Sequence, residues 1–234
     1  MAVNGMWPGD RRVRIVVQRV RLGGREYRVI SPARPLKNAS LRQMDRYFSF
    51  TVDRPEGRLM GALWLLAARS QRSVVYLPTR TAPCPPGLED DGVAVDLVMS
   101  HHSLQLRPAQ WKRIRQRISR GNPPRDLRTA RLPASDVLVE EDIDFDALDH
   151  AENRDLLRQH VYGETLFMTG STSAFRRQAR HFFDAAKTGP KVAARGYPYF
   201  PGGCNYHYCT VFDDDLPEAD QQLVHVEYLP SWTR

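Results

Sequence analysis

The sequence predicts an α+β protein with a mainly antiparallel sheet, about three helices and a β-rich N-terminal part. β-Branched and aromatic runs fill roughly the first hundred positions, helical periodicity follows, and strand-like runs return at the end. Strands grouped in this way pair with their neighbours along the chain, which favours antiparallel sheets. The chain has 234 residues, of which 41% are hydrophobic, so it can bury a core and is neither collagen-like nor fully disordered.

The first predicted element is a β-hairpin formed by residues 13–22 and 25–30. A Gly-Gly dipeptide separates these two β-rich runs, which is typical of a two-residue hairpin turn. This register places Arg21 opposite Glu26, a favourable cross-strand pair.

Three more strands are predicted at residues 47–52, 74–77 and 93–102, with turn-forming segments between them. An apolar run at 59–68 lies between the first two and is bounded by arginines. A bilayer-spanning helix needs about 20 apolar residues, so this shorter run is interpreted as a buried strand or helix. No membrane association is expected.

The clearest amphipathic helix is predicted at residues 108–120. Pro108 suits the first turn of a helix, and Trp111, Ile114 and Ile118 share one face at helical spacing. The charged residues on the opposite face are Lys112, Arg113, Arg117 and Arg120. These four cations are the candidate nucleic-acid-binding residues, because each could neutralise a phosphate. The alternative is the solvated face of an ordinary amphipathic helix.

The remaining elements are two helices and a second hairpin. Helices are predicted at about 146–160 and 174–187, and Gly189-Pro190 is expected to stop the second one. The final hairpin is expected to pair 206–212 with 222–229 around an acidic turn.

Charge divides the chain into two parts. Residues 1–132 hold 25 Lys and Arg against 10 Asp and Glu, whereas residues 133–234 hold 9 against 17. The predicted organisation is a basic β-rich region at 11–120, a Pro/Arg linker or long loop at 121–133, and an acidic helical region at 134–234 that closes with the hairpin. The three segments could also form one domain. Such asymmetry indicates either a polyanion-binding face or attraction between the two parts.

The final hairpin carries the most chemically active residues. If Thr210 pairs with Val224, Cys209 faces His225 and His207 faces Glu227, all on the side opposite the apolar face. His207, Cys209, His225 and Glu227 are candidate zinc ligands by type, although paired Cys-x-x-Cys spacing is absent. Cys209 and His225 are also candidates for thiol or acid–base catalysis. The alternative is a packed face that holds satisfied polar side chains.

A third candidate group lies in His101-His102-Ser103, at the end of a predicted strand. His102 falls on the more polar face and could act as a general base. The tripeptide fits one half of the His-x-Ser/Thr pair of two-histidine phosphoesterases, but the second half is missing from the sequence. His102, Cys209 and His225 are therefore the candidate catalytic residues.

These features favour a binding protein for an anionic partner, nucleic acid above all and otherwise an acidic protein, through its arginine-rich surface. The 30 arginines against 4 lysines support this, although a GC-rich genome would also favour arginine. The alternatives are a His/Cys- or metal-dependent enzyme, acting on phosphoesters for example, and a protein–protein regulatory or immunity-type module. The odd cysteine count and the absence of a signal-type segment predict a cytoplasmic location.

Overall fold

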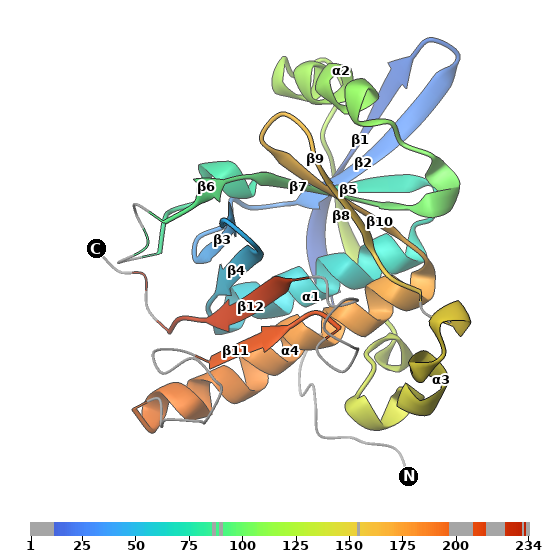
Figure 1. The fold of residues 1–234 in the computed structure, drawn as a ribbon. Coiled ribbons are helices and arrows are strands. Elements are labelled where there is room, and N and C mark those ends of the chain that lie inside the picture. Colours follow the sequence, from blue (N-terminus) through green and yellow to red (C-terminus); the bar gives the residue numbers. More distant parts are fainter. Residues whose placement is uncertain are drawn as a thin grey trace.

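The computed structural model describes residues 12–85, 88, 91–153, 155–196, 208–213, 223–230 and 232. They form two mixed sheets and four α-helices (Figure 1). The helices are α1 (Arg54–Arg69), α2 (Pro108–Ser119), α3 (Phe145–Asp149) and α4 (Thr172–Ala194). The mixture of α and β structure agrees with the predicted class.

The larger sheet has seven strands in the order β8-β1-β2-β5-β7-β10-β9. β2 and β5 run parallel, as do β7 and β10, and the other neighbours are antiparallel. The strands are β1 (Arg12–Leu22), β2 (Arg25–Pro32), β5 (Ser73–Leu77), β7 (Asp96–His101), β8 (Asp126–Arg131), β9 (Arg158–Val161) and β10 (Thr165–Gly170).

The smaller sheet has five strands in the order β11-β12-β4-β3-β6, and its one parallel pair among the described residues joins β12 to β4. Its strands are β3 (Ala39–Gln43), β4 (Phe48–Val52), β6 (Val93–Ala94), β11 (Tyr208–Val211) and β12 (Val224–Tyr228). The expectation of a mainly antiparallel sheet was therefore right only in part. The 59–68 run belongs to a helix, and the chain crosses over through α1 between the parallel strands β2 and β5.

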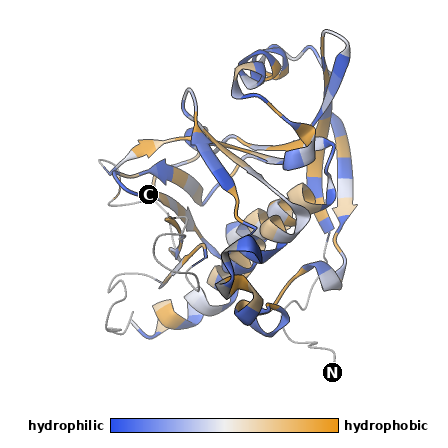
Figure 2. Cartoon of the chain, turned by 45° about the vertical axis from the view of Figure 1, so that its right-hand side comes forward, coloured by the Kyte–Doolittle hydropathy of each residue, from blue (hydrophilic) through white to orange (hydrophobic). Residues whose placement is uncertain are grey.

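The main core surrounds α1 and α4, which lie side by side (Figure 1). Trp64 of α1 contacts Phe182 of α4, and both contact Phe50 of β4 with ring centroids 4.4–5.4 Å apart. Both sheets contribute buried apolar side chains to this core. A second cluster lies where α2 covers the other face of the larger sheet, with Trp111 and Ile114 fully buried. Apolar and polar residues alternate along the strands accordingly (Figure 2).

The N-terminal hairpin forms in the predicted register, with Arg21 opposite Glu26. Three other predictions need correction. The predicted linker 121–133 contains β8, which pairs with β1 and forms one edge of the larger sheet. The predicted helix 146–160 is the short α3 followed by β9, because residues 158–161 pair with β10 instead of continuing a helix. The 93–102 strand is divided into β6 and β7, which join different sheets.

The second C-terminal helix is also longer than predicted. α4 continues through Gly189-Pro190 to Ala194. Gly189 packs directly against Tyr228, where a Cβ atom would lie 2.2 Å from the Tyr228 Cγ. Contact with β12 therefore holds this part of the chain in a helix despite the missing N–H of the proline.

Candidate functional site

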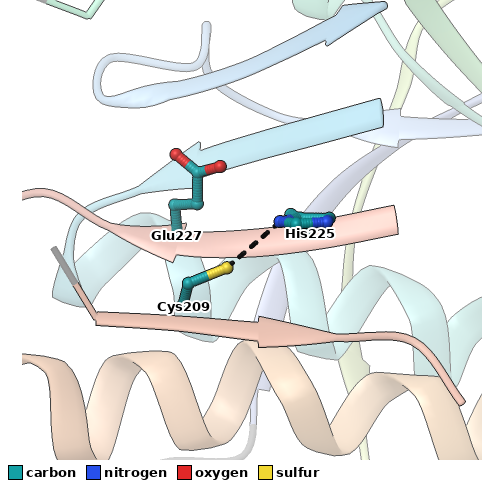
Figure 3. A group of neighbouring side chains, drawn as sticks. All are labelled: Cys209, His225 and Glu227. Carbon is teal, nitrogen blue, oxygen red and sulfur yellow. Dashed lines mark hydrogen bonds between the residues drawn. The ribbon is translucent and has the colours of Figure 1, made fainter. Parts of the chain in front are cut away.

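The C-terminal strands place one set of polar side chains on the face of the smaller sheet that points away from the core. Val224, Val226 and Tyr228 of β12 are buried in the core. His225 and Glu227 alternate with them and project from the opposite face, where Cys209 of β11 joins them (Figure 3).

The observed register differs from the predicted one by two residues. Thr210 pairs with Val226, not with Val224, and Cys209 lies opposite Glu227. Because side chains alternate with a period of two, an even shift leaves every residue on its predicted face. The structure thus brings Cys209, His225 and Glu227 together although the predicted pairing was wrong. His207, the remaining predicted ligand, lies outside the described residues.

These three side chains form a compact group, which we call the Cys–His–Glu cluster. The Cys209 Sγ lies 3.4 Å from the His225 Nδ1 (Figure 3). One ligand atom from each residue lies within 4.8 Å of the other two. Glu227 is 7% exposed, whereas Cys209 and His225 are half-buried and so can be reached from solvent.

Side chains from β4 and the preceding loop support this cluster. The Ser49 hydroxyl donates a 2.9 Å hydrogen bond to the Glu227 Oε1. The Tyr47 ring packs on the His225 ring with centroids 4.4 Å apart. These contacts fix the orientation of the carboxylate and of the imidazole.

The polar face continues across β4 and β3. Ser49 and Thr51 of β4 pair with Arg42 and Ser40 of β3, and all four side chains are less than 9% exposed. These four residues were not among the site residues predicted from the sequence. The signal was available in the strict apolar–polar alternation of residues 48–52, which predicts a strand with one polar face.

His102 lies elsewhere, on the larger sheet. It begins a 3-10 turn at the end of β7 and is exposed. It lines a pocket of about 370 Å³ together with Asp155, Leu156, Arg158, Thr169 and Gly170. The structure therefore does not bring His102 to Cys209 and His225, so the three candidate catalytic residues do not form one site.

The neighbouring His101 is buried, and its Nδ1 lies 2.7 Å from the Ser103 Oγ. Burial, with a smaller contribution from His102, lowers the pKa of His101. Asp155 on the pocket wall accepts a short hydrogen bond from Ser171, at the N-terminus of α4. His101 and Asp155 therefore each already have a hydrogen-bond partner within the protein.

The predicted nucleic-acid-binding residues lie on the outer side of α2. Trp111 and Ile114 anchor this helix on the larger sheet, and the Trp111 ring lies 4.8 Å from the Tyr76 ring. The exposed residues on the outer side include Lys112, Arg113, Arg117 and Arg120, which we call the basic face. Arg115, on the inner side, instead forms a 3.2 Å ion pair with the buried Asp96.

The acidic part of the chain leaves the basic face open, as far as the described residues show. Ion pairs between the basic and acidic parts are formed by Arg69 with Asp136 and by Arg80 with Glu164. No residue of the basic face forms an ion pair with a carboxylate in the described ranges. Within the described residues, the charge asymmetry of the sequence is therefore not cancelled by ion pairs at α2.

Comparisons with known proteins give no match to a protein-family model, to a curated protein or to a solved structure. None of the helices in the described part of the chain has the length and apolar character needed to cross a membrane. Function must therefore be argued from the side chains themselves.

Proposed function

We propose that the protein binds nucleic acid through the basic face of α2. The observation that carries this proposal is the exposure of four cations on one side of a short helix. Arg115, the one cation of the same helix that faces inward, is neutralised by Asp96. Trp111 and Ile114 anchor the helix on the sheet. Of the outward cations, Arg117 also contacts the β1–β2 hairpin through the Arg21 carbonyl.

The spacing of the basic face suits a phosphate backbone. Lys112 and Arg120 are separated by about 12 Å along the helix axis at 1.5 Å per residue. Double-stranded DNA carries one charge per roughly 1.7 Å of its axis, so several phosphates lie within reach of this stretch. Guanidinium groups also bind phosphate oxygens in a bidentate manner.

The β1–β2 hairpin extends the same surface. Its tip lies beside α2 (Figure 1), and the Arg117 side chain donates a short hydrogen bond to the Arg21 carbonyl. The Arg21 side chain is 82% exposed and shares Glu26 with Arg19. Helix and hairpin therefore form one cationic surface with a fixed relative position.

Backbone contacts of this kind imply binding that is sensitive to salt and tolerant of sequence. Neutralising four phosphates gives a slope of about −3.6 in log K against log salt concentration. Affinity for a DNA duplex of about 20 base pairs should fall roughly a hundredfold between about 50 and 200 mM salt. Fluorescence anisotropy with the intact chain would measure this slope.

The key variant replaces Arg113, Arg117 and Arg120 with glutamine. Its slope should decrease by about three, since each lost phosphate contact removes about 0.9. The matched control replaces Lys187, Lys191 and Arg195 with glutamine, because these cations are also exposed and lie along α4. We expect the control to keep the original slope. A flat salt response of the unchanged protein, or equal losses in both variants, would contradict the proposal.

A further inference from the structure

We propose that Cys209, His225 and Glu227 bind a divalent metal ion of the zinc type. This inference goes beyond nucleic-acid binding and does not depend on it, because the cluster lies on the smaller sheet and α2 covers the larger one. This site is supported by the ligand types, by the distances between the ligand atoms, and by the neighbouring groups that orient them.

The ligand types favour zinc over the alkaline-earth ions. A cysteine thiolate and a histidine nitrogen suit zinc and related transition metals, whereas Mg²⁺ and Ca²⁺ prefer oxygen atoms alone. A carboxylate is the third common zinc ligand. Three protein ligands with one open position form the coordination pattern of zinc sites that bind water or substrate.

The distances are those of a site that needs little rearrangement. Zinc bonds of about 2.3 Å to sulfur and about 2.0–2.1 Å to nitrogen, at a tetrahedral angle, place the two atoms roughly 3.5 Å apart. The observed separation of the Cys209 Sγ and the His225 Nδ1 is 3.4 Å. The ligand atoms of the cluster lie within 4.8 Å of one another. A small movement of the Glu227 side chain would complete the triangle.

The backbone holds the ligands at these distances. Cys209 and Glu227 are opposite one another in the β11–β12 ladder, and His225 is two residues along β12 on the same face. β12 is itself an inner strand, paired with β4 on its other side. Such placement on rigid strands reduces the entropy that would be lost when an ion is bound.

Neighbouring groups have the role that outer-shell residues have in metal sites. Ser49 hydrogen-bonds the Glu227 Oε1, and Tyr47 packs on the His225 ring. Hydrogen bonds of this kind orient ligands and typically alter metal affinity by about 10–100-fold. Because Cys209 and His225 are half-buried, an ion can enter from the solvent side.

The test is metal titration of the intact chain after treatment with a chelator. We expect one equivalent of Zn²⁺ to bind by calorimetry, and Co²⁺ to give the absorption of a tetrahedral site with a thiolate-to-metal charge-transfer band. Cys209→Ser should abolish that band and weaken Zn²⁺ binding at least tenfold. His225→Gln should also weaken binding, while Ser49→Ala should have a smaller effect.

The matched control is Cys84→Ser, which removes another half-buried thiol. Cys84 contacts Arg42 and is not part of the Cys–His–Glu cluster. It should leave both the Co²⁺ spectrum and the Zn²⁺ stoichiometry unchanged. Far-UV circular dichroism of each metal-free variant would verify that the fold is retained. Absence of stoichiometric binding would overturn the proposal, as would a Co²⁺ spectrum that survives Cys209→Ser. Rapid alkylation of Cys209 without any metal binding would instead indicate a reactive thiol paired with His225.

Discussion

At the scale of single residues, His181 of α4 shows how burial sets a charge state. Its side chain is 4% exposed, it shares a short hydrogen bond with Thr210, and its ring stacks on Phe212 at 5.3 Å. Burial, and then the charges of Arg180 and Arg177, hold the pKa of His181 well below its usual value. The fold therefore favours the neutral form of this imidazole over its protonated form.

This depressed pKa predicts a loss of stability in acid. Below about pH 6.5 the unfolded chain binds a proton at His181 that the native state does not, so the free energy of unfolding falls as pH decreases. The loss from one such group is at most about 1.4 kcal/mol per pH unit. His181→Gln should reduce the slope of stability against pH below about pH 6.5. Urea denaturation across this range would measure it.

The control for this prediction is His160→Gln, because His160 is exposed on β9. That variant should retain the pH dependence of the unchanged protein. Identical slopes in the two variants would contradict the assignment to His181.

Residue-scale prediction succeeded where strand periodicity alone decided the outcome. The common face of Cys209, His225 and Glu227 follows from alternation, so it survived an error of two residues in the register. His102 could not be placed in the same way, because its position depends on which sheet β7 enters. The sequence gives no local signal for that long-range choice.

At the scale of elements, the contact between α4 and β12 depends on a glycine. A Cβ atom at Gly189 would lie 2.2 Å from the Cγ and 2.5 Å from the Cβ of Tyr228. These atoms are near the backbone of β12, so the clash cannot be relieved by rotating the end of a side chain. The strand and the helix would have to separate.

Gly189→Ala should therefore destabilise the protein although alanine favours helices. Overpacking a core contact costs about 1–3 kcal/mol, whereas the gain in helix propensity is about 1 kcal/mol. The combination with Tyr228→Ala should cost less than the sum of the two single changes. Gly24→Ala is the control, since no atom lies within 4 Å of the added Cβ. Additive effects of Gly189→Ala and Tyr228→Ala, measured by chemical denaturation, would contradict this explanation.

Helices and strands could be predicted from the sequence where their apolar and polar residues lay on separate faces. Apolar and charged residues of the α2 segment lie on opposite faces, which is a clear helical pattern. The predicted helix at 108–120 was confirmed and ends one residue earlier, at Ser119. The 59–68 run is apolar on all sides, and a fully buried helix and a buried strand look alike in such a run. In the structure this run forms α1, and both sheets contribute side chains to the core around it. The periodicity of the sequence does not reveal that arrangement.

At the scale of the whole molecule, the basic and acidic parts of the sequence are structurally interleaved. β10, from the acidic part, pairs with β7, and β12 pairs with β4. α4 also packs along α1. Both sheets therefore contain strands from before and after residue 132, where the net charge of the sequence changes sign. The division of the chain into separate regions stays a prediction.

This interleaving predicts that neither part is stable alone. A fragment of residues 1–133 keeps β1–β8 but loses α4, so the core faces of Trp64 and Phe50 would be exposed to water. Exposing large apolar side chains costs about 1.5–3 kcal/mol each, so these two together cost roughly 3–6 kcal/mol, a large part of the roughly 5–15 kcal/mol that stabilises a typical domain. We expect the fragment to lack a cooperative thermal transition in near-UV circular dichroism, and the intact chain to unfold in one step. A cooperative transition of the isolated fragment would mean that the larger sheet folds without β10 and α4. The basic face on α2 would then belong to an independent domain, so the same experiment decides whether the proposed nucleic-acid binding can be separated from the Cys–His–Glu cluster.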